Sequence, residues 1–580
     1  MLTMGCTTLT VTELRLPAAA LGPENPLPVL GEDRAKVLPC LRQDGYGRSL
    51  VETDLPAVVL ENDYLRATVL PGLGGRLYSL VHKPTGRDLL FRNPVLQPAN
   101  LALRNAWFAG GVEWNLGSTG HTTMTCAPMY AGTVEGPDGS PVLRLWEWER
   151  TRNLVYQVDL WLPPDSEFLY VGVRIRNPWQ YEVPAYWWSN AAVPRTDDTR
   201  ILVPASEGWH YGYTQQLSRV DASFVTVADR DAADLFYDIP ADSPPWIAAV
   251  DSSGFGLMQA STDRLRGRKL FVWGTNPGGR RWQSWLAPGT DGYLEIQAGL
   301  APTQFEYVPM PGGASWDWLE AYGPYGDFPP LPLDSWRSIA DAEPARLFSG
   351  SGWGALELLR TGTDPLPGTP FDSLGDDQAP WLALLDGAMP VGDPLSPPGC
   401  TLVAWHSLLE AAPESWISLY HLGVARWYDG DTLGAESAWE QSSALAESPW
   451  SLRALAFARP DRAAGLLLRA VELAPTVPGL AIEALEALLA AGLAAEAATV
   501  LASLPDSVAA LGRLRLLDAR IRHALGDVAG ARAVFDAGFE VPDLREGEEI
   551  LTDTWRLIAG DEPVPAAYDF RMVTDALREG

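Results

Sequence analysis

The segment FLYVGVRIRN (residues 168–177) alternates apolar and polar side chains with a period of two. Its aliphatic side chains from Leu169 to Ile175 fall on one face. Arg174 and Arg176 fall on the opposite face. A period of two is typical of a β-strand, because successive side chains of an extended chain point to opposite sides. The segment therefore predicts a strand with one face in a hydrophobic core.

Similar alternating runs recur through the first half of the chain, and turn sequences such as Pro137-Asp138-Gly139 separate them. These runs occupy residues 65–70, 75–80, 142–148, 154–162 and 293–299. Many short strands with almost no helical pattern predict an antiparallel β-sandwich. We expect this sandwich over residues 48–330, with residues 1–47 as an N-terminal extension.

Residues 331–400 are rich in proline and tryptophan, as in the stretches TDPLPGTPF and GDPLSPPG. Proline removes a backbone donor and fixes φ, so these stretches are not expected inside a sheet. Trp336, Trp353 and Trp381 lie among them and need apolar partners. We expect this region to be a connector that wraps the sandwich.

Residues 401–580 show a helical pattern that is rich in Ala and Leu and that repeats. The block around Gly492 recurs around Gly526, a shift of 34 residues, which is the tetratricopeptide period. This pattern predicts an all-α tetratricopeptide-type repeat domain and a multidomain chain. Such repeats could bind a peptide partner, form a homo-oligomer contact or cover one flank of the sandwich.

The formal net charge of −30 argues against nucleic acid and anionic membranes as partners, because phosphate contacts require Lys and Arg. The four cysteines are far apart in the sequence and form no CxxC pair, so no zinc site is expected. The first residues lack the basic and apolar regions of a secretory signal, and no window has the length of a membrane span. We therefore expect a cytoplasmic protein.

The chain contains 24 tryptophans. The flat face and single N–H donor of tryptophan suit stacking on a sugar ring, but large sandwich cores also use tryptophan. Composition alone does not decide between these two interpretations. No phosphate-binding loop, GxSxG or HExxH pattern is present. We expect no cofactor and no metal.

Polar and aromatic residues cluster in four segments of the strand-rich half: GGVEWNLGSTGH (110–121), PAYWWSNAAVP (184–194) with EGWHYGY (207–213), VWGTNPGGRRWQSWL (272–286) and YLEIQAGLAPTQFEYVP (293–309). In the last segment, Glu295 and Gln297 share one strand face, whereas Leu294 and Ile296 take the other. This pattern fits either a lined groove or an ordinary solvated face. Because Trp187 and Trp188 point to opposite faces, only one of them can stack on a ligand.

These segments resemble the aldose 1-epimerase (galactose mutarotase-like) superfamily, in a branch where the sandwich is fused to tetratricopeptide repeats. The hairpin Gly74-Gly75-Arg76-Leu77-Tyr78 resembles the early hairpin of that superfamily, and residues 293–297 resemble its late strand. The resemblance implies a galactose mutarotase-like supersandwich and gives Glu295 the role of catalytic base. Asn190 matches the family segment His-x-aromatic-Phe-Asn, but Tyr186 stands in place of the family's histidine.

Three functions are compatible with these residues. A glycoside hydrolase would use a carboxylate pair, Glu113 and Glu295, with Glu306 in reserve. An aldose 1-epimerase would use Glu295 with His121 or His210. The third alternative is a non-catalytic sugar-binding or scaffold protein. The hydrolase is favoured, with a mono- or oligosaccharide substrate. The catalytic candidates are Glu295, Glu113, His121 and His210. The candidates for substrate binding are Arg76, Trp114, Asn115, Trp187, Trp188, Asn190, Trp209, Trp273, Gln297, Gln304 and Glu306.

Overall fold

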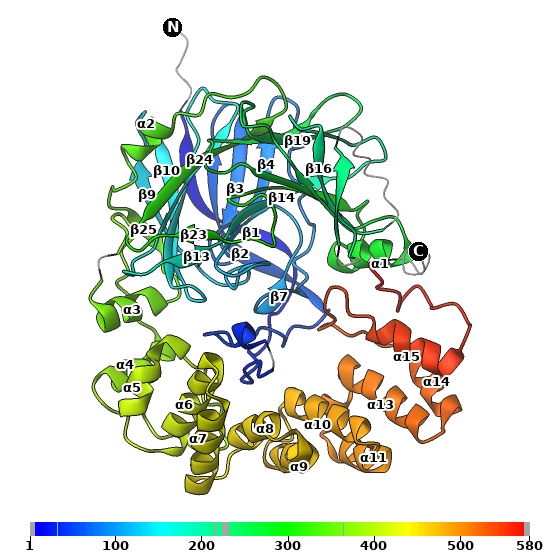
Figure 1. Ribbon diagram of the computed structural model, residues 1–580. Helices are drawn as coiled ribbons and strands as arrows, with labels where there is room; N and C mark the ends of the chain where they lie inside the picture. Colours follow the sequence, from blue (N-terminus) through cyan, green and yellow to red (C-terminus); the bar gives the residue numbers. More distant parts are fainter. Residues whose placement is uncertain (1–5, 32, 214–215, 223–230, 364, 574–580) are drawn as a thin grey trace. The chain divides into compact units, whose positions relative to one another are not determined.

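The computed structural model describes residues 6–31, 33–213, 216–222, 231–363 and 365–573 (Figure 1). The chain divides into two compact units. The first, β-rich unit contains residues 1–20, 48–375 and 570–580, and the second, helical unit contains residues 21–47 and 376–569. Residue 48 begins a segment of the first unit and also the expected sandwich, whereas residues 331 and 401 lie inside the two units. The N-terminal region and the connector are each divided between the two units.

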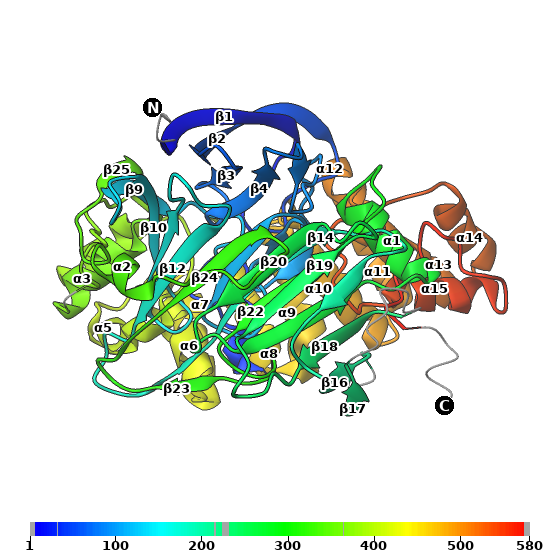
Figure 2. The same ribbon diagram turned by 90° about the horizontal axis from the view of Figure 1, so that it is seen from above.

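The larger sheet of the β-rich unit is antiparallel and has twelve strands among the described residues. Its first two strands form a long antiparallel pair at one edge (Figure 2). This pair places part of the expected N-terminal extension within the sheet. The hydrogen-bonded order is β1 (Thr8–Ala19), β2 (Leu50–Glu61), β3 (Leu65–Leu70), β4 (Arg76–His82), β8 (Val112–Leu116), β14 (Trp187–Pro194), β22 (Tyr293–Gly299), β21 (Gly267–Val272), β18 (Ala233–Tyr237), β16 (Glu207–Tyr211) and β17 (Leu217–Asp221), with β5 (Arg87–Asp88) beside β4.

The smaller sheet is also antiparallel, with nine strands in the described part of the chain. Its order is β15 (Arg200–Leu202), β19 (Trp246–Val250), β20 (Gly256–Ser261), β24 (Ser315–Pro324), β12 (Leu169–Arg176), β11 (Leu154–Trp161), β10 (Pro141–Glu149), β9 (Tyr130–Glu135) and β25 (Ala345–Phe348). Two short pairs join β6 (Ala99–Ala102) to β7 (Asn105–Trp107) and β13 (Val183–Ala185) to β23 (Val308–Met310). The strands predicted at 65–70 and 293–299 are confirmed with the same bounds.

The hydrophobic core lies between the two sheets and follows the predicted alternation. Leu169 and Ile175 of β12 are fully buried in it, together with Leu294 and Ile296 of β22. Because side chains alternate, Glu295 lies on the opposite face of β22. The core therefore fixes which face of the larger sheet carries the polar side chains.

The first part of the proline- and tryptophan-rich connector packs against the smaller sheet. It forms α2 (Leu333–Arg337), β25 and α3 (Trp353–Thr361), and both Trp336 and Trp353 are buried. Nε1 of Trp336 donates a hydrogen bond of 3.0 Å to Asp159 on β11. The wrapping also buries Arg174, which donates to Gln157 at 2.8 Å. β12 is thus covered on both faces, whereas its sequence pattern predicts a solvated outer face.

The β-rich unit contains one further helix, α1 (Pro277–Leu286), after the strand β21. Asn276 caps it, because its side chain accepts a hydrogen bond of 2.6 Å from the Gly279 amide, and Pro277 fits the first helical position. Trp282 of this helix donates a hydrogen bond of 3.0 Å to the Phe570 carbonyl. This contact attaches the C-terminal residues to the β-rich unit.

The helical unit contains successive helical hairpins. The pair α10 and α11 recurs as α13 and α14 with the predicted shift of 34 residues, and Gly492 and Gly526 occupy the left-handed region at equivalent turns. Trp381 is buried in this unit. Its helices are η1 (Arg34–Lys36), η2 (Asp376–Gln378), α4 (Ala379–Leu385), η3 (Val403–Trp405), α5 (His406–Ala411), α6 (Trp416–Asp429), α7 (Thr432–Leu445), α8 (Pro449–Ala458), η4 (Pro460–Arg462), α9 (Ala463–Leu473), α10 (Pro478–Ala490), α11 (Ala494–Ser503), α12 (Asp506–Ala509), α13 (Gly512–Ala524), α14 (Val528–Asp536) and α15 (Ile550–Ala559).

Residues 21–47 belong to the helical unit, and the Pro28 carbonyl accepts a hydrogen bond of 2.9 Å from Arg453 on α8.

Within the described ranges, no helix is both long enough and apolar enough to cross a membrane.

Candidate functional site

Polar side chains form a row across the centre of the larger sheet. Glu113 on β8 pairs with Asn190 on β14, which pairs with Gln297 on β22, which pairs with Lys269 on β21. Directly paired residues of antiparallel strands point to the same face. In the adjacent row, Glu295 pairs with Phe271 on β21. All of these side chains therefore lie on the face of the sheet opposite the core, called the outer face below.

Glu113 is the most densely bonded carboxylate of this face. Its Oε2 atom accepts hydrogen bonds from Trp107 Nε1 at 3.0 Å and from His121 Nδ1 at 2.7 Å. Its Oε1 atom accepts from the Thr125 hydroxyl and lies 3.7 Å from the guanidinium of Arg76. Burial alone would raise the pKa of Glu113, but the charges of His121 and Arg76 and the hydrogen bonds outweigh it. The pKa of Glu113 therefore lies well below its usual range, and the group stays ionised.

The loop after β8 brings His121 back to Glu113. It turns through Gly117 and Gly120, both in the positive-φ region that favours glycine. The Thr122 amide then donates a hydrogen bond of 2.8 Å to Asn115 Oδ1 on β8, which fixes the returning chain. Because an ionised carboxylate can only accept, Nδ1 of His121 must donate the proton in its bond to Glu113. The imidazole ring is thus held in one orientation, and its side chain is 20% exposed.

Glu295 lies at one end of a chain of hydrogen bonds. Its Oε2 atom accepts from Gln297 Nε2 at 2.9 Å, and Gln297 Oε1 accepts from Gln304 Nε2 at 2.7 Å. Gln304 Oε1 accepts from Lys269 Nζ at 2.5 Å, and Lys269 pairs with Asp234 at 2.8 Å. This series connects the carboxylate to a buried ion pair on β18 and β21.

Burial raises the pKa of Glu295. The positive charges of His121 and Lys269 lower it again in part, while the negative charge of Glu113 adds to the rise. These interactions indicate that His121, Glu113 and Lys269 all lie close enough to Glu295 to act on its charge. A carboxyl group with a raised pKa is suited to exchange protons near neutral pH.

Two tyrosines hold the His121 loop, namely Tyr307 in the segment after β22 and Tyr186 directly before β14. The Thr119 amide donates to the hydroxyl of Tyr307 at 3.1 Å, and the Gly120 amide donates to the hydroxyl of Tyr186 at 3.3 Å. Burial raises the pKa of Tyr186, which therefore stays protonated. Tyr186 therefore positions the loop that carries His121.

Most of the tryptophans that were candidates for sugar stacking are buried in the interior. Trp114 and Trp187 are fully buried in the core between the sheets. Trp188 is buried on the outer face, where its ring lies against Gly299, and Trp273 stacks on Trp282 with ring centroids 5.7 Å apart. Because these rings already have protein partners on their faces, stacking on a sugar by these tryptophans is not supported by the structure.

Two further candidates lie outside the cluster. On β16, His210 pairs with Leu235, whose side chain belongs to the core, so His210 points away from the outer face. Glu306 is exposed. Trp209, the neighbour of His210, is 36% exposed and shares the outer-face row of Lys269 through its pairing with Phe236.

The polar groups of Asn190 and Asn115 complete this face. Both residues are buried, and among the described residues Asn190 Oδ1 and Asn115 Nδ2 have no hydrogen-bond partner. An unsatisfied buried polar atom costs free energy, so such atoms are candidates for ligand or water contacts. Arg76 is held by the carbonyls of Phe108 at 3.2 Å and Gly110 at 2.7 Å.

Sequence analysis did not identify Lys269, Asp234, Trp107 and Thr125. For Lys269 a signal was available, since it is a lysine directly before the apolar run LFVW (270–273). A charge at such a position requires a partner. The partner Asp234 could not be found, because the two strands are paired only by the fold.

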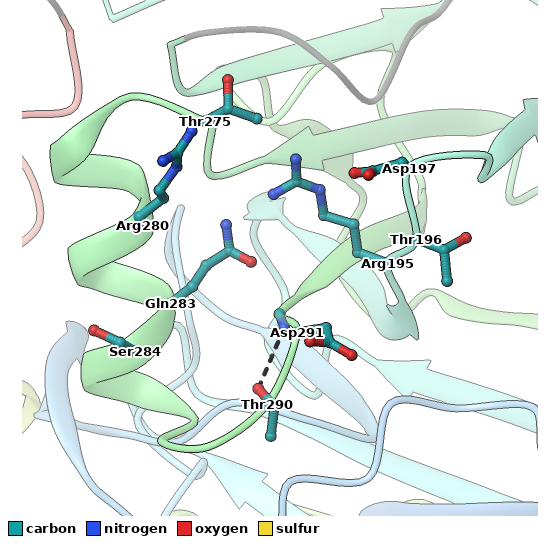
Figure 3. Close-up of a pocket in the computed structure, with 10 residues that line it drawn as sticks. Arg195, Thr196, Asp197, Thr275, Arg280, Gln283, Ser284, Thr290 and Asp291 are labelled. Atoms are coloured by element: carbon teal, nitrogen blue, oxygen red, sulfur yellow. Dashed lines mark hydrogen bonds between the residues drawn. The ribbon is translucent and has the colours of Figure 1, made fainter.

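A separate cavity of about 590 Å³ opens where β14 ends and β22 begins (Figure 3). Among the described residues, its lining consists of charged and polar side chains together with Gly292, and includes neither Glu295 nor His121. The lining residues are Arg195, Thr196, Asp197, Thr275, Arg280, Gln283, Ser284, Thr290, Asp291 and Gly292.

In the part of the chain that the structure describes, no group of three or more His, Cys, Asp or Glu side chains could hold a metal ion.

One family model matches part of the chain. Residues 32–310 match the model of a family described as a domain of unknown function, DUF5107. A solved TPR-domain containing protein from Parabacteroides distasonis ATCC 8503 is 19% identical, with 98% of each chain covered and a TM-score of 0.73. At this level of identity the likeness shows the fold, here over nearly the whole chain.

Solved structures of mutarotase-like proteins match the chain more weakly. A galactose mutarotase-like protein from Clostridium acetobutylicum is 8% identical, with a TM-score of 0.36, over 47% of this chain and 96% of its own. A galactose mutarotase related enzyme from Lactobacillus acidophilus is 10% identical, with a TM-score of 0.32, over 48% of this chain and 100% of its own.

Proposed function

We propose that the outer face binds a sugar and exchanges the configuration at its anomeric carbon, as an aldose 1-epimerase does. The observation that supports this proposal is the arrangement of one histidine and one carboxyl group with complementary properties. His121 is oriented by the ionised Glu113, and Glu295 lies on the same face with a raised pKa. One group can therefore donate a proton while the other accepts one.

The proposed reaction needs only these two proton transfers. Glu295 takes the proton from the anomeric hydroxyl, so that a carbonyl forms at C1 while the bond from C1 to the ring oxygen breaks. His121, protonated at this stage, gives its Nε2 proton to the ring oxygen. After rotation of the open-chain aldehyde, the reverse steps close the ring on the other face of C1. The sugar leaves as its second anomer, and both side chains regain their starting protonation.

The surroundings of Glu113 favour this reaction over hydrolysis. A hydrolase that pairs Glu113 with Glu295 needs one of them as the proton donor and the other as the base or nucleophile, with both facing the glycosidic bond. Glu113 is held ionised, and its two oxygen atoms already face four protein groups. It is therefore suited to orient His121. Among the alternatives considered from the sequence, hydrolysis was favoured, and these contacts move the preference to epimerisation.

The sugar hydroxyls would be bound by Asn190 Oδ1 and Asn115 Nδ2, two buried atoms that lack partners in the described part of the protein. Asn190 lies between Glu113 and Gln297 in the same row of the sheet. A ligand over this row would be in reach of both asparagines and of the Glu295 carboxylate. If Gln297 and Gln304 also contact the sugar hydroxyls, as expected from the sequence, they lose hydrogen bonds of the chain that connects Glu295 to Lys269.

The test is the rate of anomer exchange of free aldoses, measured by polarimetry and by NMR. The wild type should accelerate exchange, and Glu295→Gln should slow the turnover roughly 10²–10⁴-fold, the usual contribution of a general base. Glu306→Gln is the matched control, because it removes an exposed carboxylate close in sequence and should leave the rate unchanged. Release of sugar from nitrophenyl glycosides by the wild type, with no anomer exchange, would instead support a hydrolase. Binding of a sugar without turnover would support a non-catalytic protein.

We infer in addition that the helical hairpins are of the tetratricopeptide type, on the basis of their 34-residue recurrence. A peptide partner or a homo-oligomer contact through them remains compatible with this type of repeat. Size measurement of the purified protein in solution tests the second alternative.

A further inference from the structure

An aromatic patch extends the outer face beyond Lys269. It consists of Trp209 and Tyr211 on β16, Phe236 on β18 and Phe305 in the segment after β22, and we call it the aromatic platform. The rings of Tyr211 and Phe305 have centroids 5.0 Å apart, and those of Phe236 and Phe305 are 5.9 Å apart. Phe305 is 51% exposed and Trp209 is 36% exposed. Phe305 and Trp209 thus present apolar rings to solvent, whereas Phe236 is buried beneath them and the guanidinium of Arg219 lies over the Trp209 ring at 4.9 Å.

The platform is continuous with the proposed site. Tyr211 pairs with Asp234, Asp234 pairs with Phe271, and Phe271 pairs with Glu295, so Tyr211 and Glu295 lie in one row of the sheet. Three strand spacings separate them, which corresponds to about 14 Å. A single sugar ring with its anomeric carbon at Glu295 cannot span this distance and also stack on the platform.

The position of Phe305 is fixed by its neighbour in the sequence. Gln304 bonds to both Lys269 and Gln297, so the backbone that carries Phe305 is attached to the hydrogen-bond chain of Glu295. An exposed phenylalanine on such an anchored segment keeps its apolar surface in water, which costs free energy unless a ligand covers it. The ion pair of Lys269 and Asp234 lies between the platform and Glu295 in the sheet.

We propose that the ligand of this protein is a reducing oligosaccharide, whose terminal unit lies at Glu295 and whose further units stack on the aromatic platform. This inference rests on the proposed function. Sugar rings have apolar faces that pack on aromatic side chains and hydroxyl edges that bond to polar groups. The platform offers the first kind of contact, and Lys269, Asp234 and Gln304 offer the second. Because exchange at C1 requires a free anomeric hydroxyl, the bound unit at Glu295 is the reducing end, and the chain extends from it in one direction.

The experiment compares monosaccharides with oligosaccharides of the same unit. Glucose is measured against maltose, maltotriose, cellobiose and cellotriose, and galactose against 1,4-linked galactobiose and galactotriose, by ligand-observed NMR for binding and by polarimetry for turnover. In the wild type, at least one trisaccharide should bind about tenfold or more tightly than its monosaccharide, a gain expected for one added stacking contact. Phe305→Ala should remove most of this gain and leave the monosaccharide affinity unchanged.

The control is Phe328→Ala, which removes another exposed phenylalanine, 39% exposed, from the same unit. It should change neither affinity. Tyr211→Ala gives a second variant on the platform, and circular dichroism checks that each variant is folded. Equal binding of monosaccharides and oligosaccharides, or an equal loss for both in Phe305→Ala, would overturn the inference.

The same measurements separate this inference from the proposed function. If glucose or galactose is turned over but no oligosaccharide binds better, the inference on the platform is wrong and the epimerase remains. If an oligosaccharide binds through Phe305 but no sugar is turned over, the platform is supported and the epimerase is wrong. If no sugar of either size binds, both are overturned.

Discussion

Nδ1 of His121 lies 2.7 Å from Oε2 of Glu113, and this carboxylate is also paired with Arg76 and bonded to Trp107. The arrangement makes Glu113 an orienting group. It holds the imidazole ring by one nitrogen and keeps a negative charge beside it. The negative charge raises the proton affinity of His121, since a neighbouring anion favours the charged imidazolium.

Replacement of Glu113 by Gln should therefore change the pH dependence as well as the rate. Without the anion the pKa of His121 falls, so the alkaline limb of the anomer-exchange profile should move to lower pH. The loss in turnover should be of the order of 10²-fold or more, because the imidazole is no longer held in one tautomer. Turnover across pH 5 to 9 gives both quantities.

Thr125→Val is the matched control for this variant, because it removes one hydrogen bond to Glu113 but keeps the charge. It should leave the alkaline limb close to that of the wild type. An unchanged profile in Glu113→Gln would show that His121 is not the acid of the reaction.

Lys269 should tune the acidity of Glu295 from the other side. Its positive charge lowers the pKa of Glu295, against the larger effect of burial, which raises it. Removing the charge in a Lys269→Gln, Asp234→Asn double variant should raise the pKa of Glu295 further. A base works only when deprotonated, so the acidic limb of the rate profile should move to higher pH.

The double variant is preferred because removal of Lys269 alone leaves Asp234 as an unpaired buried charge, which can cost about 3–5 kcal/mol. The Lys269→Gln change also supplies a side-chain amide at position 269, which can donate a hydrogen bond to Gln304 in place of the ammonium group. If the acidic limb stays where it is in the wild type, the groups of this ion pair do not act on Glu295, and the chain of hydrogen bonds through Gln304 is only structural.

Much of the fold follows from local alternation, and much of the site does not. The run from Tyr293 to Gly299 places Leu294 and Ile296 in the core and Glu295 outside it, which the period of two predicts. The pairing of Lys269 with Asp234 depends on which strands become neighbours, and no local pattern contains that information. The hydrogen bond between His121 and Glu113 likewise depends on the path of a loop. Glycines and the hydrogen bond from the Thr122 amide to Asn115 determine that path.

The tryptophans show why composition is a weak guide to function. Trp114 and Trp187 share strand faces with aliphatic residues and belong to the core, as their alternation with Glu113 and Trp188 would indicate. Trp188 does lie on the outer face, but its ring covers Gly299, where no side chain competes for the space. The exposed rings of the aromatic platform come instead from Phe305 and Trp209, which composition does not distinguish from core residues.

The connector region should be sensitive to Gly172→Ala. A Cβ atom at residue 172 of β12 would lie about 2.0 Å from the ring of Trp336, so the ring has to move. We expect a loss of roughly 1–3 kcal/mol in the free energy of unfolding, the usual cost of overpacking. Gly326→Ala is the control, because a Cβ atom there has no described neighbour within 4 Å.

Urea unfolding of both variants and of Trp336→Leu measures these effects. Combining Gly172→Ala with Trp336→Leu should cost less than the sum of the two single changes, because the smaller side chain makes room for the new methyl group. Strict additivity would mean that the connector does not pack on β12 in solution.

The helical unit contains a buried histidine that should make its stability depend on pH. His421 on α6 donates through Nε2 to the Pro398 carbonyl at 3.2 Å, and its Nδ1 accepts from the Thr401 hydroxyl at 2.8 Å. Burial lowers the pKa of His421 to about 4, against 6.5 in the unfolded chain. Between these values the unfolded state binds more protons than the folded state, so stability is full above pH 6.5 and falls as the pH decreases toward 4.

The loss over this window should reach about 3 kcal/mol, because each pKa unit corresponds to about 1.4 kcal/mol. Thermal unfolding followed by circular dichroism between pH 4 and 7 measures it. The acid-dependent decrease should be smaller in His421→Gln, whereas the control His523→Gln, which removes a half-buried histidine of the same unit, should retain it. An equal decrease in wild type and His421→Gln would mean that groups other than His421 are responsible.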